Sequence, residues 1–175
     1  MRRQSGVSLL SFLLSAVLVS ATLAASAVIG AQALREREQY EDFMQVIQSV
    51  FVSLEHAIHD EWATSGCRTL VNPPSLTELV NQYGASPQIL TTPYTIDIDY
   101  RTSADVTTSA GIRITVILPE TMDSTSLRQG ALKLVDDVFM TSQRLVLYKS
   151  VSSVQSSLQH QSFNSETGCM QKELT

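Results

Sequence analysis

The chain has few basic residues and none of the compact motifs that mark common enzyme chemistries. It contains 12 lysines and arginines against 17 aspartates and glutamates, which gives a formal net charge of −5. An acidic chain with only three lysines and no basic cluster is a poor candidate for binding nucleic acid without regard to its sequence. The chain also lacks a P-loop, a G-x-G-x-x-G turn and a G-x-S-x-G elbow. Nothing in it supports an enzyme, and we expect no cofactor.

Candidate metal-binding and catalytic side chains are also sparse. His56 and His59 stand three residues apart on an expected helix, but the H-E-x-x-H order is missing and the third histidine, His160, is far away in the sequence. We therefore interpret the pair as solvated helix surface and predict neither a metal site nor a catalytic residue. Two carboxylate pairs receive the same interpretation, because neighbouring acids on a helix or a strand edge are usually solvated rather than acid–base catalysts. These pairs are Asp97 with Asp99 and Asp136 with Asp137.

Only two cysteines are present, and they are far apart. Cys67 and Cys169 each stand beside a glycine, and their separation fits no C-x-x-C metal or redox motif. If the domain lies outside the cytoplasm, a single disulfide is the natural interpretation.

Charge is absent from Val7 to Leu34, directly after Arg2 and Arg3. This run exceeds the roughly 20 apolar residues that an α-helix needs to cross a bilayer. A secretory signal cleaved after Ala27 is one interpretation, although the run is longer than a typical signal core. A second is an uncleaved anchor with its amino terminus in the cytoplasm, because uncompensated basic residues flanking a span stay inside and the arginines after this span are interleaved with glutamates. A third depends on the residues that follow.

Beyond Leu34 the apolar residues narrow to a stripe with the three- and four-residue steps of a half-buried helix. No proline occurs between Val7 and Ser65. We therefore predict one continuous helix over about residues 7–64, ended by Gly66. Trp62 closes the stripe and is expected in the core rather than as a ligand platform. The stripe consists of Tyr40, Phe43, Met44, Ile47, Val50, Phe51, Leu54, Ile58 and Trp62.

The following residues predict a short helix and a hairpin. Ser75 has the position of an N-cap, with Glu78 three residues later as its capping-box partner, for a helix over about 76–83 that Gly84 ends. Alternating apolar residues predict strands over 94–100 and 112–118. The inward residues of the first strand are Tyr94, Ile96, Ile98 and Tyr100, and the two strands are joined by a polar loop over 105–111 as an antiparallel hairpin.

The last third predicts a helix, a third strand and a loop-like tail. Residues 123–126 are expected to cap a helix over about 127–143, and a strand begins at Leu145 and extends through Tyr148 toward Val154. From Ser156 the pattern weakens, which indicates a loop. The apolar face of the expected helix consists of Leu127, Ala131, Leu134, Val135, Val138 and Phe139. The fold class is α+β, with the C-terminal half of the long helix packed on a small antiparallel sheet with one or two short helices.

The amino terminus resembles a known family. A short basic leader ending in Gly6, an uncharged helix starting at Val7 and an amphipathic continuation are similar to the class III signal of type IV pilins and pseudopilins. The resemblance covers about the first 62 residues. It implies that a prepilin peptidase cuts between Gly6 and Val7 on the cytoplasmic face and methylates the new amino group of Val7. It also implies a disulfide between Cys67 and Cys169 that holds the C-terminal region.

One position departs from the family pattern. The fifth residue after the implied cleavage is Ser11, where the family usually has glutamate. A carboxylate there can pair with the terminal amine of a neighbouring subunit, and burying either charge alone in lipid is costly. The difference favours a minor pilin or pseudopilin near a filament tip over a major pilin. The helix segment expected to take part in assembly contains Leu9, Leu10, Ser11, Phe12, Leu13 and Leu14.

These inferences divide the chain into a leader (1–6), a transmembrane and filament-core segment (7–34) and a periplasmic or extracellular head (35–175). The resemblance implies residence in a bacterial inner membrane, with the amino terminus cytoplasmic, before assembly into a pilus or secretion pseudopilus. Implied partners are other pilin subunits, the prepilin peptidase and an inner-membrane assembly platform, in the service of adhesion or protein secretion. The alternative is a periplasmic binding or interaction domain, with a signal peptide or an anchor, that forms no filament.

Overall fold

A computed structural model of the whole chain describes residues 5–67, 72–102, 109–120, 122, 124–151, 163–164 and 169–170. Its first element is helix α1, Ser5–Ser65, which extends the expected helix slightly at both ends. Gly66 ends it with a φ of 68°, a left-handed conformation that glycine adopts without steric penalty, and its N–H donates to the carbonyl of Trp62 over 2.9 Å. The chain divides into two structural units, 1–39 and 40–175, and α1 contributes to both.

Within the second unit, α1 supplies one side of the hydrophobic core. Phe43, Ile47, Val50, Leu54 and Ile58 are completely buried, at the three- and four-residue steps predicted from the sequence. The predicted stripe is therefore confirmed as the core face of the helix. Trp62 is partly buried and packs against the same core, as expected.

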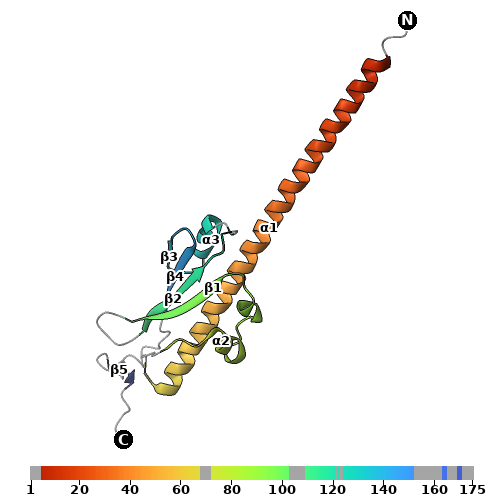
Figure 1. Cartoon of the computed structure of the whole chain (residues 1–175). Helices are drawn as coiled ribbons and strands as arrows, with labels where there is room; N and C mark the ends of the chain where they lie inside the picture. Colours follow the sequence, from red (N-terminus) through yellow and green to blue (C-terminus); the bar gives the residue numbers. More distant parts are fainter. Residues whose placement is uncertain are drawn as a thin grey trace. The chain divides into compact units, whose positions relative to one another are not determined.

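The other side of the core is a four-stranded antiparallel sheet (Figure 1). Its order is β1-β2-β4-β3, so β2 and β4 are paired in the centre and β1 and β3 form the edges. Side chains alternate between the two faces, and the face toward the core contains the fully buried Ile112, Ile114, Leu145 and Leu147. The strands are β1 (Thr95–Thr102), β2 (Ser109–Ile117), β3 (Asp137–Met140) and β4 (Arg144–Ser150).

Two short helical segments between α1 and β1 add buried residues to this core. Helix α2, Leu76–Gln82, begins at the predicted capping box: the Ser75 hydroxyl accepts from the Glu78 N–H, and the Glu78 carboxylate accepts from the Ser75 N–H over 2.7 Å. The Ser75 hydroxyl also donates to the Glu78 carboxylate over 2.8 Å, and the two bonds that this carboxylate accepts, the backbone one first, lower the pKa of Glu78. The 3₁₀ segment η1, Pro87–Leu90, follows and buries Ile89.

The predicted helix over 127–143 is wrong. Helix α3 spans only Ser124–Ala131, and the chain then turns into strand β3. Val138 is buried while its neighbour Phe139 is 67% exposed, the alternation of a strand rather than the shared face of a helix. Pairing with β4 aligns Val138 with Leu147, and these ladder hydrogen bonds replace those of a longer helix.

Strand β4 ends at Ser150, and Val151 is no longer part of it, so the predicted extension toward Val154 does not begin there. Residues 152–154 lie outside the described residues. Most of the predicted loop over 105–111 and Asp123 of the predicted cap also lie outside them. Of the tail, the described residues form two short paired strands, β5 (Phe163–Asn164) and β6 (Cys169–Met170).

Candidate functional site

The first structural unit presents an apolar helical surface. In the described part of α1, ten large apolar side chains before residue 35 are each more than half exposed. Among the described residues α1 is the one helix long and apolar enough to cross a bilayer, a property that membrane anchors and signal sequences share. The exposed side chains are Phe12, Leu13, Leu14, Val17, Leu18, Val19, Leu23, Val28, Ile29 and Leu34.

Hydroxyl groups within this apolar segment are satisfied by the helix itself. Ser15, Ser20, Thr22 and Ser26 each donate to the carbonyl three residues earlier, at 2.8 to 2.9 Å. In a bilayer there is no water to accept these protons, so an internal partner removes most of the cost of placing a hydroxyl in lipid. The four polar side chains are thus compatible with an apolar environment.

The residues expected to direct processing and assembly all belong to α1. Gly6 and Val7 lie in its first turn, followed by Leu9, Leu10 and Ser11. Cleavage between Gly6 and Val7 and the assembly role of this segment stay predictions.

Of the two histidines on α1, His59 lies against an aromatic side chain. The His59 ring meets the Trp62 ring edge to face, with centroids 5.6 Å apart. No group of three or more His, Cys, Asp or Glu side chains suited to a metal ion occurs among the residues that the structure describes. His160 lies outside those residues.

One carboxylate in each pair has a partner elsewhere in the fold. Asp99 forms an ion pair with Arg113 on the neighbouring strand, while Asp97 is exposed. The Asp136 carboxylate accepts from the hydroxyl and the N–H of Ser150, and these bonds, the hydroxyl first, lower its pKa. Neither pair lines the pocket described next.

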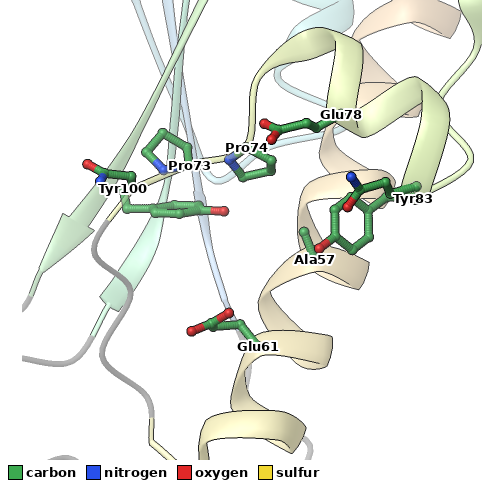
Figure 2. Close-up of a pocket in the computed structure, with 9 residues that line it drawn as sticks. Ala57, Glu61, Pro73, Pro74, Glu78, Tyr83 and Tyr100 are labelled. Carbon is green, nitrogen blue, oxygen red and sulfur yellow. The ribbon is translucent and has the colours of Figure 1, made fainter.

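A pocket of about 380 Å³ lies between the C-terminal part of α1, the segment before α2, the end of α2 and strand β1. Figure 2 shows Tyr83, Tyr100 and Glu61 arranged around it, with Pro73 and Pro74 forming another wall. Burial raises the pKa of Tyr100 far above its usual value, and the nearby Tyr83 and Glu61 raise it further, so this phenol stays neutral. The remaining lining residues are Ala57, Asn72, Glu78 and Gln82.

Sequence reasoning missed this pocket, because its walls come from four stretches of the chain that only the fold brings together. The prolines and the capping box were visible, but as signals of a loop and a helix start. The local signal for Tyr100 was its place at the inward end of a strand, which indicates core.

The two cysteines form a disulfide, as expected, with a sequence separation of 102 residues. The bond fixes strand β6 to Cys67, two residues beyond the end of α1, and the same two cysteines form a β-bridge.

Comparison with protein-family models, with curated proteins and with solved structures finds no match for this chain. The long apolar N-terminal helix, the small four-stranded antiparallel sheet and the C-terminal disulfide are consistent with a pilin-like architecture.

Proposed function

We propose that the protein is a minor type IV pilin or pseudopilin, a structural subunit that enters a filament through its N-terminal helix. The observation that carries the proposal is α1 itself. A single helix begins before residue 7, contains no charge until Arg35 and continues without a break into the core of an α+β head. A secretory signal alone gives no reason for the helix to continue through Ala27 in phase with the core stripe.

The exposed apolar surface supports a place among similar helices. When the helix leaves the lipid, its ten large exposed apolar side chains must be buried against other apolar surface rather than exposed to water. Burying six of them would stabilise a helical bundle by roughly 10 kcal/mol, at about 1.5 to 3 kcal/mol for each side chain. The serine and threonine hydroxyls already donate to helix carbonyls, so burying them adds little free-energy cost in lipid or in a helical bundle.

Ser11 supports a minor subunit at or near the tip. A subunit with glutamate at this position can neutralise the terminal amine of a neighbour, which favours addition to a growing polymer. Ser11 has no charge to offer. The protein is therefore proposed to begin or cap a filament rather than repeat along it.

The mature amino terminus tests this proposal most directly. Intact mass and N-terminal sequencing of the protein from its producing cells should give methylated Val7 as the first residue. Val28 as the first residue would instead mean a cleaved secretory domain, and an intact Met1 would mean a plain anchor. Either of those results refutes the filament proposal.

Two substitutions extend the test. Gly6→Ala should leave the precursor uncut, whereas Gly30→Ala, at a helix position where an added Cβ meets no atom within 4 Å, should be processed normally. If both variants are processed alike, the prepilin peptidase is not the enzyme involved.

The tip role has its own test. Ser11→Glu should increase the amount of protein recovered in sheared filaments, while Ser15→Glu, one helical turn later, should not. A Ser11→Glu protein that assembles no better than the parent removes the reason for the tip assignment.

A further inference from the structure

The pocket between α1, α2 and β1 has walls of two different kinds. Pro73, Pro74 and the rings of Tyr83 and Tyr100 provide apolar surface (Figure 2). Oxygen atoms are supplied by the two phenols, by the carboxylate of Glu61 and by further polar side chains. A ligand suited to such a site has an apolar stem and a polar end that can meet these groups.

The charges of the lining residues indicate that the polar end of the ligand is positively charged. Two of the nine lining residues, Glu61 and Glu78, carry carboxylates, and none is lysine, arginine or histidine. The Glu78 carboxylate is already occupied by the capping box, where it accepts from Ser75. Glu61 is exposed and lies across the pocket from Tyr100 in Figure 2, and it remains the group best placed to meet a cation.

The aromatic side chains also favour a cationic ligand. A tyrosine ring attracts an ammonium or guanidinium group over its face, and the attraction grows where the cation is partly removed from water. Since Tyr100 remains un-ionised, its phenol offers both a neutral ring and an accepting oxygen. The three-carbon or four-carbon stem of a basic side chain can pack along proline and tyrosine surface while its charged head reaches the carboxylate.

We propose that this pocket binds the side chain of a lysine or arginine on a partner polypeptide, with Glu61 as the anionic contact and Tyr83 and Tyr100 as the aromatic walls. The inference concerns the head alone and does not depend on filament assembly. It assigns the head an interaction surface in addition to the role of α1.

The test uses the full chain in nonionic detergent micelles with ¹³C-labelled tyrosine rings. The probe is the peptide acetyl-Gly-Lys-Gly-amide, and the control is the same peptide with norleucine, which keeps the stem and removes the charge. The lysine peptide should shift the ring signals of Tyr83 and Tyr100 in a saturable way, with the signals assigned through Tyr83→Phe and Tyr100→Phe. Equal binding of the norleucine peptide, or no shift at millimolar peptide, overturns the proposal.

Two variants with the same change of charge test the anionic contact. Glu61→Gln should weaken binding of the lysine peptide roughly tenfold, since the amide keeps an accepting oxygen but loses the negative charge that strengthens the hydrogen bond to the ammonium group. Asp60→Asn changes an exposed neighbour on α1 that does not line the pocket, and it should leave the Kd unchanged. Unaltered urea unfolding of both variants, followed by Trp62 fluorescence, ensures that the comparison concerns binding.

Two further outcomes would also refute the assignment. If Glu61→Gln and Asp60→Asn have the same effect, the pocket does not select its ligand through Glu61. If n-butylammonium binds as tightly as the peptide, the site takes free amines and a polypeptide partner is not required.

Discussion

The packing of Tyr40 against Gly130 gives a quantitative test of how α3 is attached to α1. A Cβ atom added at Gly130 would lie 2.4 Å from the Tyr40 Oη, 2.6 Å from its Cε2 and 2.7 Å from its Cζ. Nonbonded heavy atoms are at their best separation near 3.5 to 4.0 Å, so an added methyl group overlaps the edge of the ring. Gly130→Ala therefore forces either the ring or α3 to move.

The expected cost follows from two opposing effects. Overpacking a close contact destabilises a protein by about 1 to 3 kcal/mol. Alanine is a better helix former than glycine by up to about 1 kcal/mol, which offsets part of that cost. We expect Gly130→Ala to lower the free energy of unfolding by up to about 2 kcal/mol. With Tyr40→Ala already in place the overlap disappears, and Gly130→Ala should then be neutral or stabilising by up to about 1 kcal/mol.

The assay is urea unfolding of the full chain in micelles, followed by the fluorescence of Trp62, the single tryptophan, which packs against the core. With a slope near 2 kcal/mol/M, a loss of 2 kcal/mol moves the midpoint down by roughly 1 M. The four proteins of the cycle give a coupling free energy, which should be about 1 to 3 kcal/mol. Equal effects of Gly130→Ala with and without Tyr40 would refute the reasoning, because they would show that the ring moves aside at no cost.

Three other perturbations have expected outcomes. Replacing both cysteines by serine should lower the free energy of unfolding by up to about 4 to 5 kcal/mol, because the bridge spans 102 residues, and reduction of the parent protein should give the same urea midpoint. Lys149→Met should cost roughly 1 kcal/mol by leaving the half-buried Glu55 carboxylate unpaired where an ion pair of 2.6 Å now exists, and adding Glu55→Gln should recover most of the loss. Because hydrogen bonds from Ser150 lower the folded pKa of Asp136, their stabilisation is present above the unfolded value near 4 and is lost as the pH falls through the folded pKa. Ser150→Ala should therefore flatten the acid limb of the stability profile, and an unchanged limb would contradict this cause.

Local sequence patterns predicted correctly those elements whose apolar residues all face the core with one regular period. The stripe on α1, the capping box at Ser75 and the alternation in β1 and β2 each repeat with one period, and the core confirms them. Each of these patterns specifies both the element and the face it buries. The fold class could therefore be predicted without knowing the strand order.

The failure at 127–143 has a physical reason. Leu134, Val135, Val138 and Phe139 fit a helical period as well as they fit a turn followed by a strand. What decides between them is the ladder with β4, and that pairing depends on the position of β4 beside β2 rather than on residues near 138. The exposed Phe139 is the residue that a helical interpretation places wrongly.

The pocket could not be predicted from patterns within single segments, for a related reason. Glu61, Pro73, Tyr83 and Tyr100 each have an ordinary role within their own segment. Only the packing of α1, α2 and β1 in one core turns them toward a shared space.

The bond between Cys67 and Cys169 makes most of the head a covalent ring. A protease that cuts any one peptide bond between the two cysteines opens that ring but releases no fragment. The nicked protein would keep its mass on a nonreducing gel, apart from one added water, and would separate into two pieces only after reduction. Under non-reducing conditions, a single cut therefore leaves every segment of the head covalently tethered to α1.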